Sequence, residues 1–131
     1  MRALIAVFVG GALGTAIRLS IDAAIPHSDT QFPLSTLLIN IVGSFALAVL
    51  VTRLWPVAPA WLRAGLGPGV VGGFTTFSAV MVSMVTLAAN SEIVQALGYL
   101  GITLVLGFGA AALGFFLGRR RTSDPTIGVN E

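Results

Sequence analysis

The chain lacks cysteine altogether and has only one histidine and five acidic residues among its 131 positions. Without cysteine it has no disulfide, no thiolate nucleophile and no soft-metal thiolate site. The histidine, His27, lies in a loop-like segment, and no acidic residue lies deep inside an apolar segment. Metal-dependent hydrolysis and acid–base catalysis lack the side chains that they need, so the sequence does not predict an enzyme.

Charge of either sign is scarce along the chain. Charged residues make up 9% of it and apolar residues 56%, whereas roughly a quarter of a soluble domain is charged. About 20 apolar residues are needed to cross a bilayer as a helix, and four segments reach that length, roughly 3–25, 34–54, 61–89 and 93–117. We therefore expect an all-α membrane protein with four transmembrane helices in lipid. Its net charge of +2 does not indicate a nucleic-acid partner.

The arginines lie mainly on one side of these four spans. The N-terminus, the loop between the second and third spans and the C-terminal tail share that side, which carries Arg2, Arg53, Arg63, Arg119, Arg120 and Arg121. By the positive-inside rule we expect a multi-pass protein of the plasma or inner membrane with both termini in the cytoplasm. Residues 1–118 form the membrane unit, and residues 119–131 form a basic, polar tail that we expect to be disordered.

The third span contains an unusual polar segment. It has no charge from Ala64 to Ser91, yet Gly72 and Gly73 are followed by Phe74-Thr75-Thr76-Phe77-Ser78. Glycine costs a helix about 1 kcal/mol relative to alanine, and an unpaired peptide group in hydrocarbon costs several kcal/mol. We expect the third helix to break here, at mid-membrane, where protein or a bound species satisfies the backbone.

Small residues recur at helical spacing in three of the spans. The pairs and triplets are Gly10 and Gly14, Gly65 with Gly69 and Gly73, and Gly114 and Gly118. This spacing predicts close approach of helix backbones, because no side chain separates them. Four short helices cannot both enclose a water-filled path and seal it from lipid, so a transport function requires at least a dimer.

Two polar residues inside the spans each have two interpretations. Asn40 is isolated in the second span, and its amide is suited either to donating hydrogen bonds to an anion or to clamping two helices together. Arg18 lies about two-thirds along the first span, where it either pairs with Asp22 one helical turn later or attracts anions to a pore mouth.

Two further residues are suited to lining a path for a small anion. The ring edge of Phe77 carries partial positive charge, although most intramembrane phenylalanines only pack. Thr103 in the fourth span brings a hydroxyl donor, although membrane threonines usually bond back to their own helix.

Three motifs together resemble those of one family. Gly10-Gly11-Ala12-Leu13-Gly14-Thr15-Ala16-Ile17-Arg18, Asn40-Ile41-Val42-Gly43-Ser44-Phe45 and Gly72-Gly73-Phe74-Thr75-Thr76-Phe77-Ser78 are similar, in order and spacing, to the signatures of the Fluc/CrcB fluoride channels. The resemblance covers nearly the whole chain before the tail. It implies two four-helix subunits packed antiparallel, two pores, and passive export of fluoride to relieve its toxicity.

The resemblance also assigns roles to particular residues. In the family a structural sodium ion at the dimer interface is held by backbone carbonyls of the broken third helix, which here implies Gly72 and Thr75. The resemblance implies a fluoride path lined by Asn40 and Phe77, with Ser78 and Thr103 as further polar members. Arg18 matches the arginine at the vestibule of the family's pore.

The chain departs from the family after Ser78. Family members usually continue with a second pore phenylalanine, whereas here Ala79-Val80 follows, so Val80 leaves an antiparallel homodimer with an incomplete aromatic set. The arginine bias also opposes insertion in both orientations. Together these features favour a heterodimer with a homologous subunit that inserts oppositely, although a homodimer remains an alternative.

Two other functions are compatible with four spans. The first is a nonconducting structural subunit. This alternative holds if fluoride requires contact with the phenylalanine ring that family members have where this chain has Val80. A small proton-coupled exporter of organic cations is less consistent with the sequence, because it needs a membrane-embedded carboxylate.

Overall fold

The computed structural model describes residues 1–26, 28 and 31–119, and these residues form helices and connecting turns with no strand. Helix α1 comprises Arg2–Ala24. Helix α2 (Leu34–Val49) continues into the π-helical segment η1 (Leu50–Leu54). The third span comprises α3 (Ala60–Ala64), π-helical η2 (Gly65–Val71), α4 (Gly72–Phe74) and α5 (Phe77–Ala89), and α6 comprises Ile93–Gly118. The predictions of an all-α fold and of four membrane-spanning segments are confirmed.

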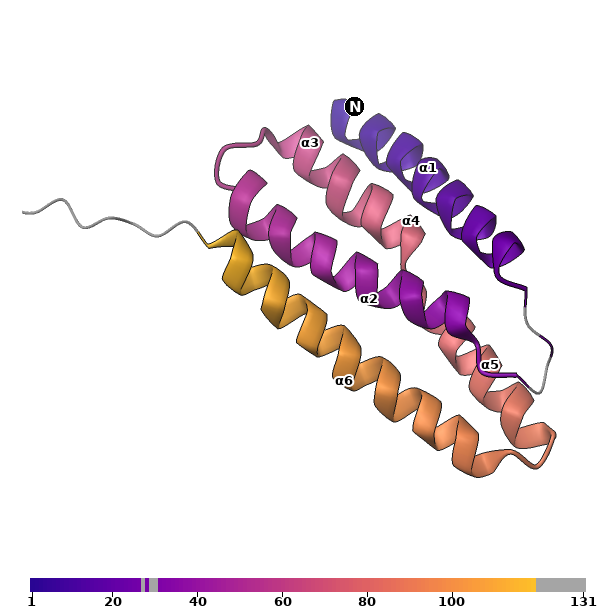
Figure 1. Cartoon of the computed structure of the whole chain (residues 1–131). Coiled ribbons are helices and arrows are strands. Elements are labelled where there is room, and N and C mark those ends of the chain that lie inside the picture. The colour runs from indigo at the N-terminus through magenta and orange to yellow at the C-terminus, as the bar shows by residue number, and fades with distance from the viewer. Residues whose placement is uncertain (27, 29–30, 120–131) are drawn as a thin grey trace, which may run out of the picture.

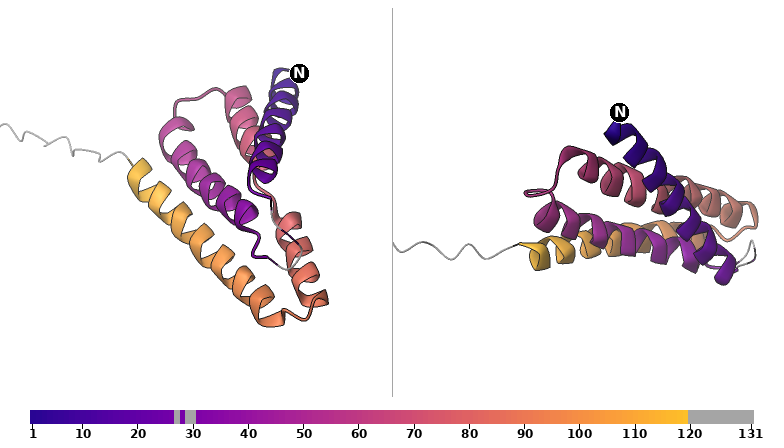
Figure 2. Two further views of the ribbon diagram at one scale, coloured as in Figure 1. Left: turned by 45° about the vertical axis from the view of Figure 1, so that its right-hand side comes forward. Right: turned by 90° about the horizontal axis from the view of Figure 1, so that it is seen from above.

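The third span changes its packing partner along its length. Its first half, α3 to α4, lies beside α1, whereas α5 lies against α6 (Figures 1 and 2). Helix α2 lies between the first half of the third span and α6, and it packs along most of α6. The point where the third span passes from one neighbour to the other therefore lies next to α2.

Glycines bring α1 into direct backbone contact with the third span. A Cβ at Gly10 would clash with the carbonyl oxygen of Gly65, and a Cβ at Gly14 would clash with that of Val70. On the opposite side of the contact, a Cβ at Gly73 would lie 2.5 Å from the carbonyl oxygen of Gly11. The predicted close approach is confirmed, and it holds α4 in place just before the third span changes direction.

Glycines make the same kind of contact between α6 and the second span. A Cβ at Gly114 would lie 2.6 Å from the carbonyl oxygen of Phe45, and a Cβ at Gly118 would clash with the hydroxyl of Thr52. These contacts confirm the prediction for the fourth span. They fix the C-terminal half of α6 against α2 and η1.

A small apolar core lies between α2, α5 and α6. Val80 and Tyr99 are completely buried there together with Leu37, and Phe32 packs its ring edge-on against Tyr99 with centroids 5.2 Å apart. Most other large apolar side chains of the single chain are exposed, as expected for helices that face lipid or another subunit.

Four described arginines lie at the same end of the helix bundle. Arg2 begins α1, Arg53 lies in η1, Arg63 lies in α3 and Arg119 follows α6. Figure 1 shows the N-terminus, the end of the second span, the start of α3 and the end of α6 on one side. The disorder predicted for the tail concerns residues 120–131, which lie outside the described residues. The cytoplasmic position of this end remains a prediction.

Candidate functional site

The third span is interrupted by two residues with extended backbone. Helix α4 ends at Phe74, and Thr75 and Thr76 have ψ angles of 153° and 120° before α5 begins at Phe77. Thr75 remains tied to the preceding helix, because both its N–H and its hydroxyl donate to the carbonyl of Val71 at 2.9 Å. Thr76 turns away from that helix and needs partners elsewhere.

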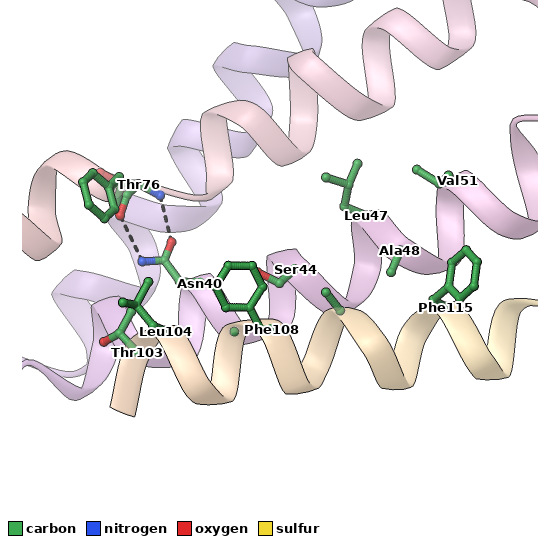
Figure 3. Close-up of a pocket in the computed structure, with 13 residues that line it drawn as sticks. Asn40, Ser44, Leu47, Ala48, Val51, Thr76, Thr103, Leu104, Phe108 and Phe115 are labelled. Carbon is green, nitrogen blue, oxygen red and sulfur yellow. Dashed lines mark hydrogen bonds between the residues drawn. The ribbon is translucent and has the colours of Figure 1, made fainter. Parts of the chain in front are cut away.

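Asn40 supplies the backbone partners of Thr76. Its Nδ2 donates to the Thr76 carbonyl at 2.9 Å, and its Oδ1 accepts from the Thr76 N–H at 2.9 Å (Figure 3). The side chain thus replaces two helical hydrogen bonds that the extended backbone has lost. Of the two interpretations of Asn40, the helix clamp is the one present in the chain. Its amide also lines a groove, described below, with one Nδ2 proton left over.

The first turn of α5 is capped by hydroxyl groups. Thr76 Oγ1 accepts from the N–H of Ala79 at 3.2 Å, which is the usual role of a threonine before a helix. It also lies 3.1 Å from the hydroxyl oxygen of Ser78. Ser78 is therefore linked to the cap, and it is not one of the residues that line the groove.

The interruption leaves two backbone carbonyls without their usual helical donors. They are the carbonyls of Gly72 and Thr75, which the family resemblance assigns to a sodium ion. In a continuous helix, the carbonyl of Gly72 would accept from the N–H of Thr76, and that of Thr75 would accept from the N–H of Ala79. Those N–H groups donate instead to Asn40 and to Thr76 Oγ1. Backbone carbonyls freed in this way are the hard oxygen ligands that suit a small cation.

Arg18 and Thr15 reach the same region from α1. Arg18 Nε donates to the carbonyl of Gly73 at 3.3 Å, and the hydroxyl of Thr15 donates to it at 3.4 Å. Among the described residues no ion pair joins Arg18 to Asp22: Arg18 is hydrogen-bonded to the third span, and the Oδ1 atom of Asp22 is buried without a hydrogen-bond partner. The vestibule role of Arg18 stays a prediction.

A groove of about 430 Å³ runs beside the interruption between α2 and α6. It brings together three of the predicted path residues, Asn40, Phe77 and Thr103. The complete lining is Asn40, Ser44, Leu47, Ala48, Val51, Thr76, Phe77, Thr103, Leu104, Gly107, Phe108, Ala111 and Phe115. Figure 3 shows Asn40 and Thr103 near Thr76, with the Phe108 ring beside Asn40 and Ser44 and the Phe115 ring farther along α6. The lining has no charged side chain.

Several groove residues were not predicted from the sequence. Ser44 lies one helical turn after Asn40, within the same motif. Phe108 and Phe115 are seven positions apart on α6 and share one face of the helix with Leu104, Gly107 and Ala111. Residues four or seven positions apart share a helix face, so the spacing places Phe108 and Phe115 on one face of α6, but it does not indicate what that face contacts.

A buried hydroxyl cluster extends the polar side of the groove. The hydroxyls of Thr103 and Tyr99 are both buried without a hydrogen-bond partner of good geometry. Buried hydroxyls normally have partners, so the hydroxyl of Thr103, which lines the groove, has capacity to donate to a species that enters it.

Val80 is separated from the groove. It is completely buried in the core beside Leu37 and Tyr99, and it is not among the lining residues. In the single subunit the aromatic rings at the groove belong to Phe77, Phe108 and Phe115.

The family of the chain follows from a comparison with protein-family models. The model described as "CrcB-like protein, Camphor Resistance (CrcB)" matches residues 5–115. The chain belongs to the CrcB family. The match includes every candidate site residue named above, from Arg18 to Thr103, and excludes the tail.

Curated CrcB-family relatives are similar over most of their length. The fluoride-specific ion channel FluC of Paracoccus denitrificans is 39% identical over 113 residues, which cover 86% of this chain and 91% of that protein. FluC 2 of Halalkalibacterium halodurans is 36% identical over 118 residues, with 89% and 86% covered. FluC 1 of Listeria monocytogenes is 40% identical over 110 residues, with 83% and 91% covered. The CrcB family is one of ion channels, and the chain is accordingly not an enzyme.

Proposed function

We propose that the chain is a subunit of a fluoride-selective channel that exports fluoride passively and so relieves its toxicity. The observation that carries the proposal is the groove in which the amide of Asn40, the ring of Phe77 and the hydroxyl of Thr103 meet without any charged side chain. A fluoride ion that leaves water needs close hydrogen-bond donors and positive ring edges in its place. The names of the relatives as fluoride channels support the same conclusion.

A second subunit is part of the proposal, because the groove is exposed in the single chain. Phe77 is 63% exposed and Phe108 is 74% exposed, so neither ring is yet enclosed. An antiparallel partner of the same fold would cover these rings and exclude lipid from the path. The chain itself then contributes Asn40, Phe77 and Thr103, with Ser78 acting through the cap at Thr76.

The proposal includes a structural sodium ion at the dimer interface. The carbonyls of Gly72 and Thr75 would hold it, since the donors they would have in a continuous helix are engaged elsewhere. When bound, the ion would supply positive charge between the two subunits. It would hold the carbonyl oxygens of the interrupted third span of each subunit close together. The carbonyl of Gly73 is already satisfied by Arg18 and Thr15, so it is not a candidate ligand.

The partner is proposed to be a homologous subunit that inserts in the opposite orientation. This proposal depends on the arginines at one end of the bundle, which favour a single orientation of this chain. The numbered names FluC 1 and FluC 2 among the relatives are compatible with paired subunits. Val80 in place of a second pore phenylalanine is compatible with the same pairing.

The orientation of the chain in the membrane is testable by labelling single introduced cysteines, because the chain has no cysteine of its own that would react. We expect Ser91→Cys to react with a membrane-impermeant maleimide in intact cells, and Ser123→Cys to react only after permeabilisation. Equal labelling of both variants in intact cells would contradict a fixed orientation. It would favour the antiparallel homodimer instead.

Fluoride efflux from liposomes tests the function itself. We expect liposomes with this chain and a homologous, oppositely inserting subunit to release fluoride rapidly and to retain chloride. Liposomes with this chain alone are expected to release little, and preparation of the pair without sodium is expected to reduce efflux. Full efflux by the chain alone would refute the obligatory partner, and no efflux by either preparation would refute the channel.

The nonconducting structural subunit remains a second candidate because of Val80. If it is correct, substitutions at the groove of this chain leave the efflux of the pair unchanged. The exporter alternative has no supporting observation, since the described carboxylates, Asp22 and Glu92, lie in the last turn of α1 and directly before α6.

A further inference from the structure

We propose that a second groove, at the arginine-bearing end of the bundle, binds the headgroup of an anionic phospholipid. The groove has a volume of about 460 Å³ and lies between η1, the loop after it and the end of α6. Its lining is Val51, Thr52, Arg53, Pro56, Val57, Phe115 and Arg119. It shares only Val51 and Phe115 with the groove beside Asn40, so it is a different site.

Both guanidinium groups of the groove are held by the end of α6. Arg53 Nη2 donates to the carbonyl of Leu117 at 2.7 Å. The guanidinium carbon of Arg119 lies 5.4 Å from the centroid of the Phe115 ring, within the range of a cation–π contact. Each guanidinium has about five N–H donors, so most of these donors remain for the oxygen atoms of a phosphate. Arginine binds phosphate with two parallel hydrogen bonds, which favours this ligand over a monatomic anion, since such an ion has no second oxygen to accept.

The described carboxylates do not neutralise this positive charge. Asp22 lies in the last turn of α1, and Glu92 directly precedes α6. Both therefore lie at the end of the bundle away from Arg53 and Arg119. An anion in the groove experiences attraction from the two arginines without repulsion from either of these acids.

The depth and the apolar wall of the groove select a lipid among phosphate-bearing ligands. Helix α6 has 26 residues, and a helix of that length extends about 39 Å, compared with a hydrocarbon core of about 30 Å. The end of α6 therefore reaches the headgroup region. Phe115, one helical turn before Arg119 on α6, is 45% exposed, and Val57 in the loop after η1 is 72% exposed, so the groove has apolar surface for the acyl-chain region of a lipid.

Native mass spectrometry of the full chain purified in detergent tests this site. In an equal mixture of phosphatidylglycerol and phosphatidylcholine, we expect phosphatidylglycerol to remain bound preferentially. Each of Arg53→Gln and Arg119→Gln is expected to lower that preference by about fivefold, the effect of one arginine near an anionic lipid. Arg63→Gln is the matched control, because it removes one exposed arginine from α3 at the same end but outside the groove, and it is expected to preserve the preference.

Other outcomes would overturn the proposal. An equal decrease for Arg63→Gln would indicate diffuse attraction to surface charge, and displacement of the lipid by soluble glycerol phosphate would indicate a free-phosphate site. Absence of any preference would mean that the groove is not a lipid site, including the case in which a second subunit covers it. If a glutamine variant does not fold, Arg53→Lys with Arg119→Lys keeps the charge and is expected to show a smaller decrease, because an ammonium group cannot bind phosphate bidentately. An unchanged preference in that variant would contradict recognition by these guanidinium groups.

Discussion

Replacing Asn40 with aspartate is expected to reduce fluoride efflux by at least about 100-fold. The substitution keeps an oxygen that accepts from the N–H of Thr76 but removes the donor to the Thr76 carbonyl. It also introduces a negative charge into the groove, and two like charges about 4 Å apart repel by roughly 4 kcal/mol at an effective dielectric constant of 20. Fluoride release from liposomes containing the variant and its partner subunit measures the effect.

A second Asn-to-Asp substitution, outside the groove, controls for the added negative charge on the subunit. The side chain of Asn90 makes one hydrogen bond, from its Nδ2 to the carbonyl of Thr86, and Asn90 is exposed at the end of α5. We expect Asn90→Asp to retain efflux within about a factor of two, since a single exposed bond contributes little. If a correctly folded Asn40→Asp variant conducts like the parent, the groove beside Asn40 is not the fluoride path.

Replacing Phe77 with leucine is expected to reduce fluoride efflux by at least about tenfold while leaving the subunit folded. The ring is 63% exposed in the single chain, so its removal costs little packing within the subunit. Leucine has no ring edge with partial positive charge, and loss of an aromatic contact of about 1.4 kcal/mol corresponds to a tenfold change. The measurement is the rate of fluoride release, with chloride release recorded in the same liposomes.

Phe116 provides the control for Phe77. It is also a phenylalanine of a span, is 69% exposed, and does not line the groove. Phe116→Leu is expected to conduct fluoride normally. Normal efflux by both phenylalanine variants together with the partner would favour the nonconducting structural subunit, whereas equal loss in both would indicate general disruption of the assembly.

The sequence was a sufficient guide to the spans and to part of the groove. Asn40, Phe77 and Thr103 were predicted as path residues, and the structure brings these three together. Ser78 was predicted in the same role but lies at the cap of α5, linked to Thr76. Phe108 and Phe115 were missed because an apolar helix face looks the same whether it packs on protein, lipid or an anion path.

The interpretation of Arg18 could not be decided from local spacing. An aspartate four residues later is a reasonable partner on an isolated helix. In the folded chain, α1 packs closely on the third span, and the carbonyl of Gly73 becomes the acceptor 55 positions away. A freed carbonyl in a helix–helix contact needs a donor, and Arg18 is within reach of it.

By itself, the sequence determined that this chain has four segments long and apolar enough to cross a membrane and that six arginines share one side of them. These properties depend on the length of apolar segments and on residue type, which are additive along the chain. Only the tertiary structure decided that Asn40 clamps the backbone of Thr76, 36 positions away, that Val80 is buried in the core, and that two arginines meet at the end of α6. Such contacts depend on how the helices pack, because a hydrogen bond or a buried contact requires two distant segments to meet at a distance of a few ångströms.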